Sequence, residues 1–294
     1  MTEGAAVLRW GVERRLEFIE FRLFWEGGVN RADIIEMFDV SVPQASKDLT
    51  LYQERAPQNA IYDKRAKRYV ASPQFAPVFL KPDPDNYLSR LRAIAEGLTE
   101  PGQSWIANPP HMDIALTPRR EVDPMVLRAV IDAVRENRSI EIYYQSMNPE
   151  RDNAIWRRMT PHAFGYDGLR WHARAFCHLA NKYKDFLLPR ILETRDAGEP
   201  GGGDVGDDLW RDIFDVEIGP HPALTANQQA VVAKDYGMTG GCAILKVRYA
   251  MLFYVLKRLG LLGDATKASP KTQHIVVLNR EATEAALERA ELQL

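Results

Sequence analysis

Residues 30–52 decide the fold of the N-terminal region, and they read NRADIIEMFDVSVPQASKDLTLY. Asn30 stands where it can cap a short helix over residues 31–38, because an Asn side chain accepts a hydrogen bond from an unpaired first-turn N–H. Ser41 and Gln44 have the S-x-x-Q spacing of a capping box for a following helix. The stretch therefore predicts two short helices joined by a tight turn.

The flanking residues extend this pair to three helices and a hairpin. Residues 10–26 carry apolar side chains at the spacing of one long amphipathic helix, which a Gly pair ends. Residues 60–62 and 68–71 predict two short strands joined by a basic tip. This order of elements predicts a winged helix-turn-helix, which places its third helix in the major groove of duplex DNA.

Local charge locates the surface that would face DNA. The whole chain has a net charge of -2, which does not favour a polyanionic partner. Residues 1–40 hold five bases and eight acids, whereas residues 41–72 hold six bases and three acids. The residues expected to face base edges or phosphates are Ser41, Gln44, Ser46, Lys47, Thr50, Lys64, Arg65, Lys67 and Arg68. The alternative is a small helical scaffold domain with a solvated basic tip.

Length and composition limit the class of protein. A chain of 294 residues exceeds one ordinary core, so two or three domains are expected. No apolar run approaches the roughly 20 residues of a membrane span, and the N-terminus lacks a signal-peptide pattern, which predicts a cytoplasmic protein without a membrane partner. The two cysteines lie far apart, and no catalytic or metal-binding motif is present. We therefore expect a protein that is not an enzyme and that has no cofactor or metal site.

The middle of the chain predicts a connector and then a sheet. The DNA-binding domain would span residues 1–80, followed by a helical connector over residues 81–137 with helices at 85–96 and 124–137. A domain over residues 138–196 follows, a small twisted sheet or barrel. Its predicted strands cover residues 139–146, 160–166, 169–178 and 186–193.

The last third, residues 197–294, predicts a C-terminal α/β module. It opens with a Gly- and acid-rich stretch, residues 196–208, that is typical of a flexible loop. The G-x-G-x-x-G string at residues 201–206 opens no apolar helix and is too acidic to hold a pyrophosphate, so we reject a dinucleotide site. Strands are predicted at 214–218, 243–248 and 274–278, with helices at 225–236, 251–259 and 281–292.

The predicted strands carry a candidate pocket. Alternation along residues 169–178 gives one polar face and one face expected in the core, with Trp171, Ala173, Ala175 and Cys177. Taken one at a time, the polar residues are more often structural. If the polar faces of neighbouring strands converge, they form a cationic pocket for an anionic ligand such as a nucleotide, from Tyr144, Ser146, His162, His172, Arg174 and Arg190.

The strings RWHARAFCH at residues 170–178 and FLLPRI at residues 186–191 resemble the WYL domain. Of the signature tripeptide only Trp171 is kept, and Leu187 stands where many members carry an Arg. With YQSM at 144–147, the chain is most similar to WYL-domain regulators encoded beside bacterial phage-defence operons. The resemblance implies an Sm-like β-barrel, a dimerising C-terminal extension, repression of an adjacent operon, and a nucleotide or nucleic-acid effector at the six pocket residues.

Together these features predict an α+β multidomain protein: a winged helix-turn-helix, a central Sm-like β-barrel WYL domain and a C-terminal α/β dimerisation extension. The leading hypothesis is a homodimeric repressor of a phage-defence operon and its own gene, which binds an inverted repeat and is released by an anionic ligand. An RNA- or single-stranded-DNA-binding adaptor that uses the barrel is the alternative.

Overall fold

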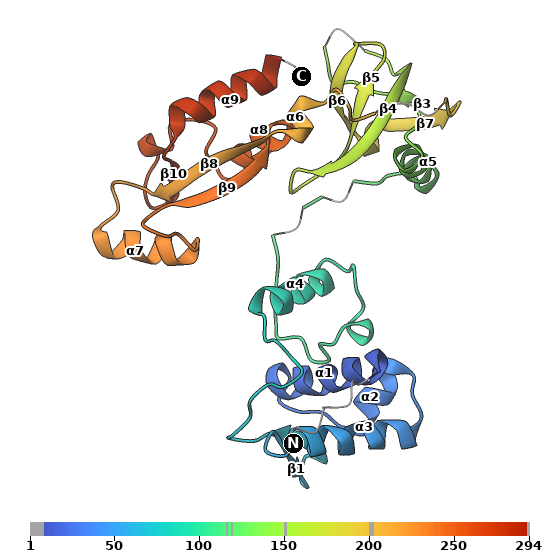
Figure 1. The fold of residues 1–294 in the computed structure, drawn as a ribbon, viewed down its shortest axis with the longest axis vertical. Coiled ribbons are helices and arrows are strands. Elements are labelled where there is room, and N and C mark those ends of the chain that lie inside the picture. Colours follow the sequence, from blue (N-terminus) through green and yellow to red (C-terminus); the bar gives the residue numbers. More distant parts are fainter. Residues whose placement is uncertain (1–8, 116, 119, 150–151, 200–202, 293–294) are drawn as a thin grey trace, which may run out of the picture. The chain divides into compact units, whose positions relative to one another are not determined.

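The structure is a computed structural model that describes residues 9–115, 117–118, 120–149, 152–199 and 203–292. The chain divides between Thr117 and Pro118 into two compact units, shown in Figure 1 and described one at a time below. Within the described ranges, no helix is long and apolar enough to cross a membrane.

The first unit is built from three helices, a hairpin and a fourth helix (Figure 1). The hairpin pairs Ala60 with Ala71 and Asp63 with Arg68, as the sequence predicts. Its elements are α1 Trp10–Trp25, α2 Arg31–Phe38, α3 Val42–Arg55, β1 Ala60–Asp63, β2 Arg68–Ala71, α4 Pro84–Ala95 and the short helix η1 Pro101–Gln103.

Two helix caps confirm and correct the sequence analysis. The Asn30 side chain accepts from Asp33 N at 3.2 Å, and the Asp33 carboxylate accepts from Asn30 N at 2.6 Å, which completes a capping box on α2. On α3 the box is only half made. Ser41 Oγ accepts from Gln44 N at 3.3 Å, but the Gln44 amide donates to Asp48 instead of returning to Ser41. The side-chain amide of Gln44 is turned toward the Asp48 carboxylate one turn along.

The core of the first unit includes residues from the first half of the predicted connector, residues 81–137. Leu16, Phe18 and Ile19 of α1 pack with residues of α2 and α3. Leu91 of α4 and Trp105 beyond it belong to the same core. Residues 81–106 are therefore part of the helix-turn-helix unit, while the second predicted connector helix lies in the other unit.

The second unit begins with α5 (Pro124–Arg135) on an antiparallel five-stranded sheet, ordered β6-β5-β4-β3-β7 (Figure 1). Among the described residues the edge strands β6 and β7 do not pair, so the sheet is open and the closed Sm-like barrel expected from the resemblance is not found. The strands are β3 Ile140–Tyr144, β4 Ile155–Tyr166, β5 Trp171–Cys177, β6 Lys182–Leu187 and β7 Ile191–Arg195.

Two sequence predictions fail on this sheet. The strand expected over residues 186–193 is interrupted by the short helix η2 (Leu188–Arg190), since Pro189 has no N–H to donate to a ladder. Trp171 was expected in the core, but it is 53% exposed and packs against Tyr166 on the hairpin that β4 and β5 form. The other core-face residues of β5 are buried against Val130 of α5 and its neighbours.

The C-terminal part confirms the predicted alternation of strands and helices. Its antiparallel sheet has the order β10-β8-β9, and one face buries Val216 and Val247 against Leu252 of α8. The elements are α6 Asp208–Arg211, β8 Ile213–Pro220, α7 Ala226–Asp235, β9 Ala243–Arg248, α8 Tyr249–Arg258, η3 Ala265–Lys267, β10 Ile275–Val277 and α9 Arg280–Leu292.

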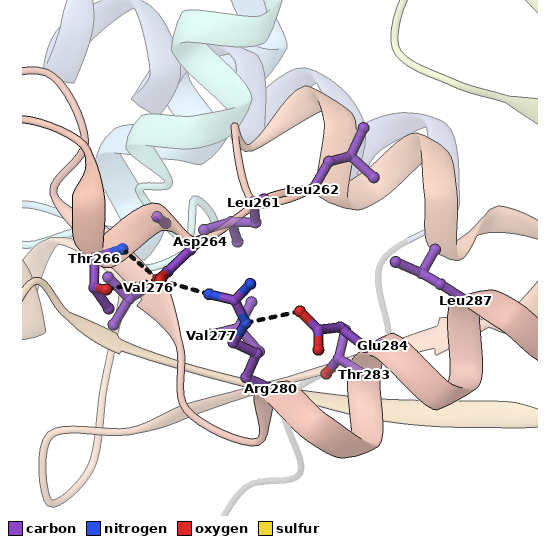
Figure 2. Close-up of a pocket in the computed structure, with 12 residues that line it drawn as sticks. Leu261, Leu262, Asp264, Thr266, Val276, Val277, Arg280, Thr283, Glu284 and Leu287 are labelled. Carbon is purple, nitrogen blue, oxygen red and sulfur yellow. Dashed lines mark hydrogen bonds and ion pairs between the residues drawn. The ribbon is translucent and has the colours of Figure 1, made fainter.

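A small pocket lies where α9 meets the segment before β10 (Figure 2). Arg280 crosses it, with Nη1 at 2.6 Å from Asp264 Oδ1 and Nε at 2.7 Å from Glu284 Oε1. Its volume of about 30 Å³ holds little more than one water molecule. The Arg280–Asp264 pair holds the start of α9 to the segment before η3.

Candidate functional site

Helix α3 buries one side and leaves the other open. Asp48, Leu49 and Tyr52 are buried, whereas Lys47 and Thr50 are exposed. Asp48 holds the helix to α1 by accepting from Arg15 Nε at 2.6 Å and Nη2 at 3.3 Å. Because Asp48 is buried and bonded to α1, the pair fixes the rotation of α3 and so fixes which side chains face outward.

The predicted polar residues of α3 are engaged to different degrees. Gln44 Nε2 donates to Asp48 Oδ1 at 3.0 Å, and the Thr50 hydroxyl donates to the Ser46 carbonyl at 3.1 Å. The Ser46 hydroxyl donates to the Val42 carbonyl at 3.0 Å and accepts from Arg31 Nη1 at 3.2 Å. Arg31, the first residue of α2, thus brings a cation beside α3. The sequence analysis missed it, although a base at a helix start beside the turn was a usable signal.

The hairpin of β1 and β2, called the wing below, presents three of its four predicted bases to solvent. Lys64, Arg65 and Lys67 are exposed, and Asp63 Oδ1 shapes the tip by accepting from Arg65 N at 2.8 Å. Arg68 differs because Nη2 donates to the carbonyls of Gly28 and, at 3.4 Å, Glu26. Its guanidinium fastens the wing to the end of α1 rather than extending outward.

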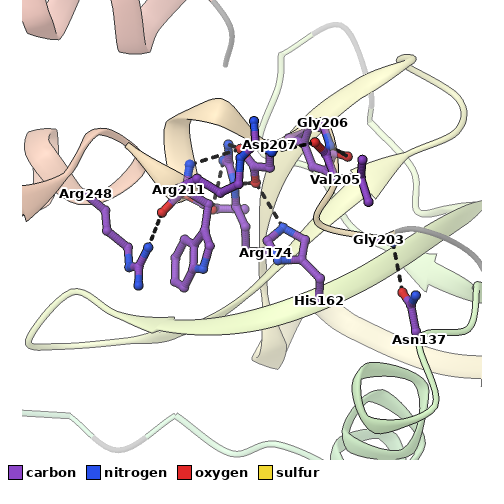
Figure 3. Close-up of polar contacts among 12 residues, drawn as sticks. Asn137, His162, Arg174, Gly203, Val205, Gly206, Asp207, Arg211 and Arg248 are labelled. Atoms are coloured by element: carbon purple, nitrogen blue, oxygen red, sulfur yellow. Dashed lines mark hydrogen bonds and ion pairs between the residues drawn. The ribbon is translucent and has the colours of Figure 1, made fainter. Parts of the chain in front are cut away.

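Charged residues of the five-stranded sheet converge on a carboxylate from outside it (Figure 3). Arg174 Nε and Nη2 donate to Asp207 at 2.7 and 2.9 Å, and His162 Nε2 lies 3.0 Å from Asp207 Oδ2. Arg174 Nη1 also donates to Asp185 Oδ1 at 3.2 Å. Arg174 and Asp207 are each 1% exposed, so this cluster is shielded from water.

The pKa values of this cluster follow from that shielding. Burial acts to raise the pKa of Asp207, but hydrogen bonds from Arg174 and His162 outweigh it and lower the pKa to about 2. Burial acts to lower the pKa of Arg174, yet Asp207 and Asp185 leave it raised. Asp207 is therefore a fixed anion and Arg174 a fixed cation at neutral pH.

A second carboxylate holds the neighbouring histidine. His172 Nε2 lies 3.1 Å from Asp167 Oδ2, which also accepts from Arg170 Nε at 2.8 Å. The His172 ring packs 5.0 Å from the ring of Tyr254 on α8, whose hydroxyl donates to Asp185 Oδ2 at 3.1 Å. Burial and the Asp185 charge raise the pKa of Tyr254, so the phenol stays protonated and can donate.

Family models match three consecutive parts of the chain. Residues 11–93 match the BrxR transcriptional regulator winged helix-turn-helix domain, residues 125–195 the WYL domain, and residues 213–283 the BrxR transcriptional regulator C-terminal dimerization domain. The DNA-binding transcriptional repressor CapW of Stenotrophomonas maltophilia is 39% identical over 95% of this chain and 93% of its own. The chain belongs to the CapW family of repressors.

Further CapW relatives have similar coverage. The repressor of Escherichia coli (strain KTE188) is 35% identical over 98% of this chain and 95% of its own, and that of Pseudomonas aeruginosa is 35% identical over 95% and 93%. Proteasome accessory factor B/C of Arthrobacter aurescens covers 99% of this chain and 51% of its own, at 16% identity and a TM-score of 0.26, which is too low to carry an argument.

Membership of the CapW family confirms the coarse predictions. The chain is a DNA-binding transcriptional repressor with a winged helix-turn-helix, a WYL domain and a C-terminal dimerization domain. DNA and a second copy of the chain are therefore its partners. Its homologues are transcriptional repressors, which are not enzymes.

In this CapW-family chain the six predicted pocket residues do not form one pocket. Tyr144 lies in the hydrophobic core of the sheet, 5.1 Å from the Phe186 ring, and its hydroxyl accepts from Leu187 N at 3.3 Å. Ser146 Oγ accepts from Asn148 N at 3.2 Å, and Arg190 ends η2. His172 and Arg174 lie on the opposite face of β5 from the core residue Ala173. Only His162 and Arg174 share a partner.

The sequence analysis missed the carboxylates that hold these cations. Asp185 is paired with Arg174 across β5 and β6, so cross-strand pairing was a usable signal once the hairpin was drawn. Asp207 lies in the Gly- and acid-rich stretch predicted to be a flexible loop, part of which falls outside the described residues. Nothing in the local sequence distinguishes Asp207 from Asp204 or Asp208, which are exposed.

Proposed function

We propose that this chain is the homodimeric repressor of a phage-defence operon and of its own gene, that it binds an inverted repeat through α3 and the wing, and that a nucleotide or nucleic-acid fragment at the WYL domain releases it. The part of this proposal that concerns DNA binding, called the DNA half below, rests on one observation. The open side of α3, with Lys47 and Arg31, is accompanied by a wing with three exposed bases. A dimerization domain on the same chain supports a two-fold operator.

The part of the proposal that concerns release by a ligand, called the ligand half below, is supported by the positive charge on the WYL sheet. Arg174 is a planar, permanently charged donor fork, which suits phosphate and carboxylate oxygens equally. His162 adds a third donor at the same point. A phosphate group on a nucleotide or nucleic-acid end has the charge and geometry for these donors.

A gel shift with the upstream region of the protein's own gene tests the DNA half. We expect a shift at low salt. We expect Lys47→Ala to weaken it and to reduce the slope of log affinity against log salt by about 2, because the dimer loses one phosphate contact on each half-site. Lys271→Ala removes the same charge from an exposed position of the second unit and is the matched control. Absence of any shift at low salt contradicts the DNA half.

Titration of the preformed complex with nucleotides and short oligonucleotides tests the ligand half. We expect the operator to be released at a saturable concentration. A complex that persists at every concentration contradicts the ligand half and leaves the DNA half standing.

The adaptor alternative is favoured by one surface of the WYL sheet. The Tyr143 and Trp156 rings lie 5.3 Å apart across β3 and β4, and the Arg195 guanidinium lies 3.9 Å from the Trp156 ring. Aromatic and Arg faces of this kind stack on unpaired bases. A salt-dependent preference for single strands over the duplex operator would favour the adaptor.

A further inference from the structure

We propose that Asp207 is an internal substitute for the anionic ligand: a phosphate group replaces it on Arg174 and His162, and the exchange releases α6. This inference rests on the proposed ligand half of the function. It adds the group that the ligand must displace and the element that moves as a result.

The donor geometry around Asp207 is that of an anion site. Arg174 presents two N–H groups to the two carboxylate oxygens, at 2.7 and 2.9 Å, and His162 Nε2 lies 3.0 Å from one of them. Two parallel bonds from a guanidinium also match two oxygens of a phosphate group. A phosphate can therefore take over these donors without rearrangement of β4 or β5.

Charge balance requires an exchange rather than simple addition. Arg174 is buried, and its charge is balanced by Asp207 and Asp185. A third anion beside these two would be repelled, whereas removal of Asp207 alone would leave a buried cation short of a partner. Asp185 stays on the neighbouring strand through its register with Arg174 and its bond from Tyr254. Asp207, on a connecting segment, is the carboxylate that can leave.

The carboxylate of Asp207 also supports the start of α6. Its Oδ1 accepts from Trp210 N at 3.2 Å, and its backbone carbonyl accepts from Trp210 N and Arg211 N, each at 3.1 Å. The same group therefore holds the WYL sheet through Arg174 and caps the short helix. When Asp207 leaves Arg174, the contact with the sheet is lost, and the four-residue helix keeps only the local bonds of its own cap.

Helix α6 is connected to the dimerization domain. Arg248 lies at the end of β9 and just before α8, its guanidinium is 5.1 Å from the Trp210 ring, and it donates to the Trp210 carbonyl (Figure 3). A displaced α6 therefore changes the support of the β9–α8 junction. This gives the ligand a physical route from the WYL sheet to the domain that pairs two copies.

Calorimetric titration of the full chain with inorganic phosphate, against acetate and chloride at matched ionic strength, tests the exchange. Asp207→Asn removes the competing charge and keeps a side chain that caps helices well, so phosphate affinity should rise by about tenfold or more. Asp208→Asn, which neutralises the exposed neighbour, is the matched control and should bind phosphate as the natural chain does. Equal phosphate affinity in all three proteins, or no phosphate binding by any of them, overturns the proposal.

Hydrogen exchange on the natural chain provides a test that does not depend on a variant folding. Phosphate should speed exchange at the amides of Trp210 and Arg211, because a four-residue helix that is no longer held to the sheet opens its local bonds more often. Slower or unchanged exchange at saturating phosphate overturns the proposal. Operator binding is measured separately, so a chain that shifts its operator but shows no phosphate effect contradicts the inference alone, while a chain that never shifts DNA contradicts the proposed function.

Discussion

Replacing Glu20 by Gln should destabilise the DNA-binding unit strongly, although no buried volume is lost. Glu20 is fully buried on α1. Its carboxylate accepts from the backbone N–H groups of Val78, Phe79 and Leu80 at 2.7 to 2.9 Å, and from the Tyr52 hydroxyl at 3.1 Å. It thereby fixes the segment that leaves the wing against the helical core.

The size of the effect follows from these bonds. A Gln oxygen can still face the three N–H groups, but each bond changes from a charged to a neutral acceptor and loses about 1 kcal/mol. The total is about 3 kcal/mol, which at about 1.5 kcal/mol per molar urea moves the unfolding midpoint of this unit by about 2 M.

Hydrogen exchange across a urea series, read on peptides that cover α1 and residues 76–82, isolates this unit within the full chain. Glu17→Gln is the matched control, since Glu17 makes a partly exposed pair with Arg14 at 2.7 Å. Such a pair contributes about 0 to 1 kcal/mol. If the midpoint of Glu20→Gln moves no further than that of Glu17→Gln, the carboxylate does not hold this segment and the reasoning is wrong.

Three further outcomes are expected. The pKa of Asp207 is lowered from 3.8 to about 2, so its contribution to stability is present above pH 3.8 and is lost as pH falls toward 2. Acid unfolding of Asp207→Asn should lack that loss. An acid unfolding profile that is the same as that of the natural chain would contradict the pairing. Gly28→Ala should lower stability and operator affinity more than Gly27→Ala. Both glycines have positive φ, but only at Gly28 would a Cβ meet the wing backbone. Equal effects of the two substitutions in unfolding and gel-shift assays would refute this. Arg68→Ala should reduce both stability and operator affinity, whereas Arg65→Ala should reduce only the affinity, with a fall in salt slope of about 2 because the dimer carries two copies of the contact. A purely electrostatic effect at Arg68 would show that its guanidinium faces phosphate.

The elements that the sequence predicts well are those whose signals are local. The α2 cap at Asn30, the charged hairpin and the strand-helix alternation of residues 213–292 depend on residues within a few positions of one another. It was harder to predict which core a longer segment joins. Helix α4 was placed correctly along the chain, but the core that it joins is set by contacts with Phe21 and Trp105 on distant segments.

The open edge of the sheet and the separate positions of Tyr144 and Arg174 could not be predicted for a related reason. A pattern of alternating residues shows which side chains share a strand face, but not whether the two edge strands meet. In the described part of the sheet, η2 separates β6 from β7, and Tyr144 faces the core while Arg174 faces α6. Tyr144 therefore lies on the opposite face of the sheet from His172 and Arg174, whereas Ser146 and Arg190 lie outside the strands.

The missed carboxylates change what the predicted cations mean for regulation. Counting bases alone gives an open cationic pocket, but Arg174 already has its anions in Asp185 and Asp207. An incoming phosphate must therefore compete with a bound carboxylate, and its net affinity is the difference between two similar sets of bonds. Such a site binds inorganic phosphate only at high concentration, and it binds a ligand with further contacts at lower concentration. On the proposed exchange, we expect the repressor to stay on its operator at the ordinary level of free phosphate and to be released at lower concentration by a larger anion that adds contacts beyond Arg174 and His162.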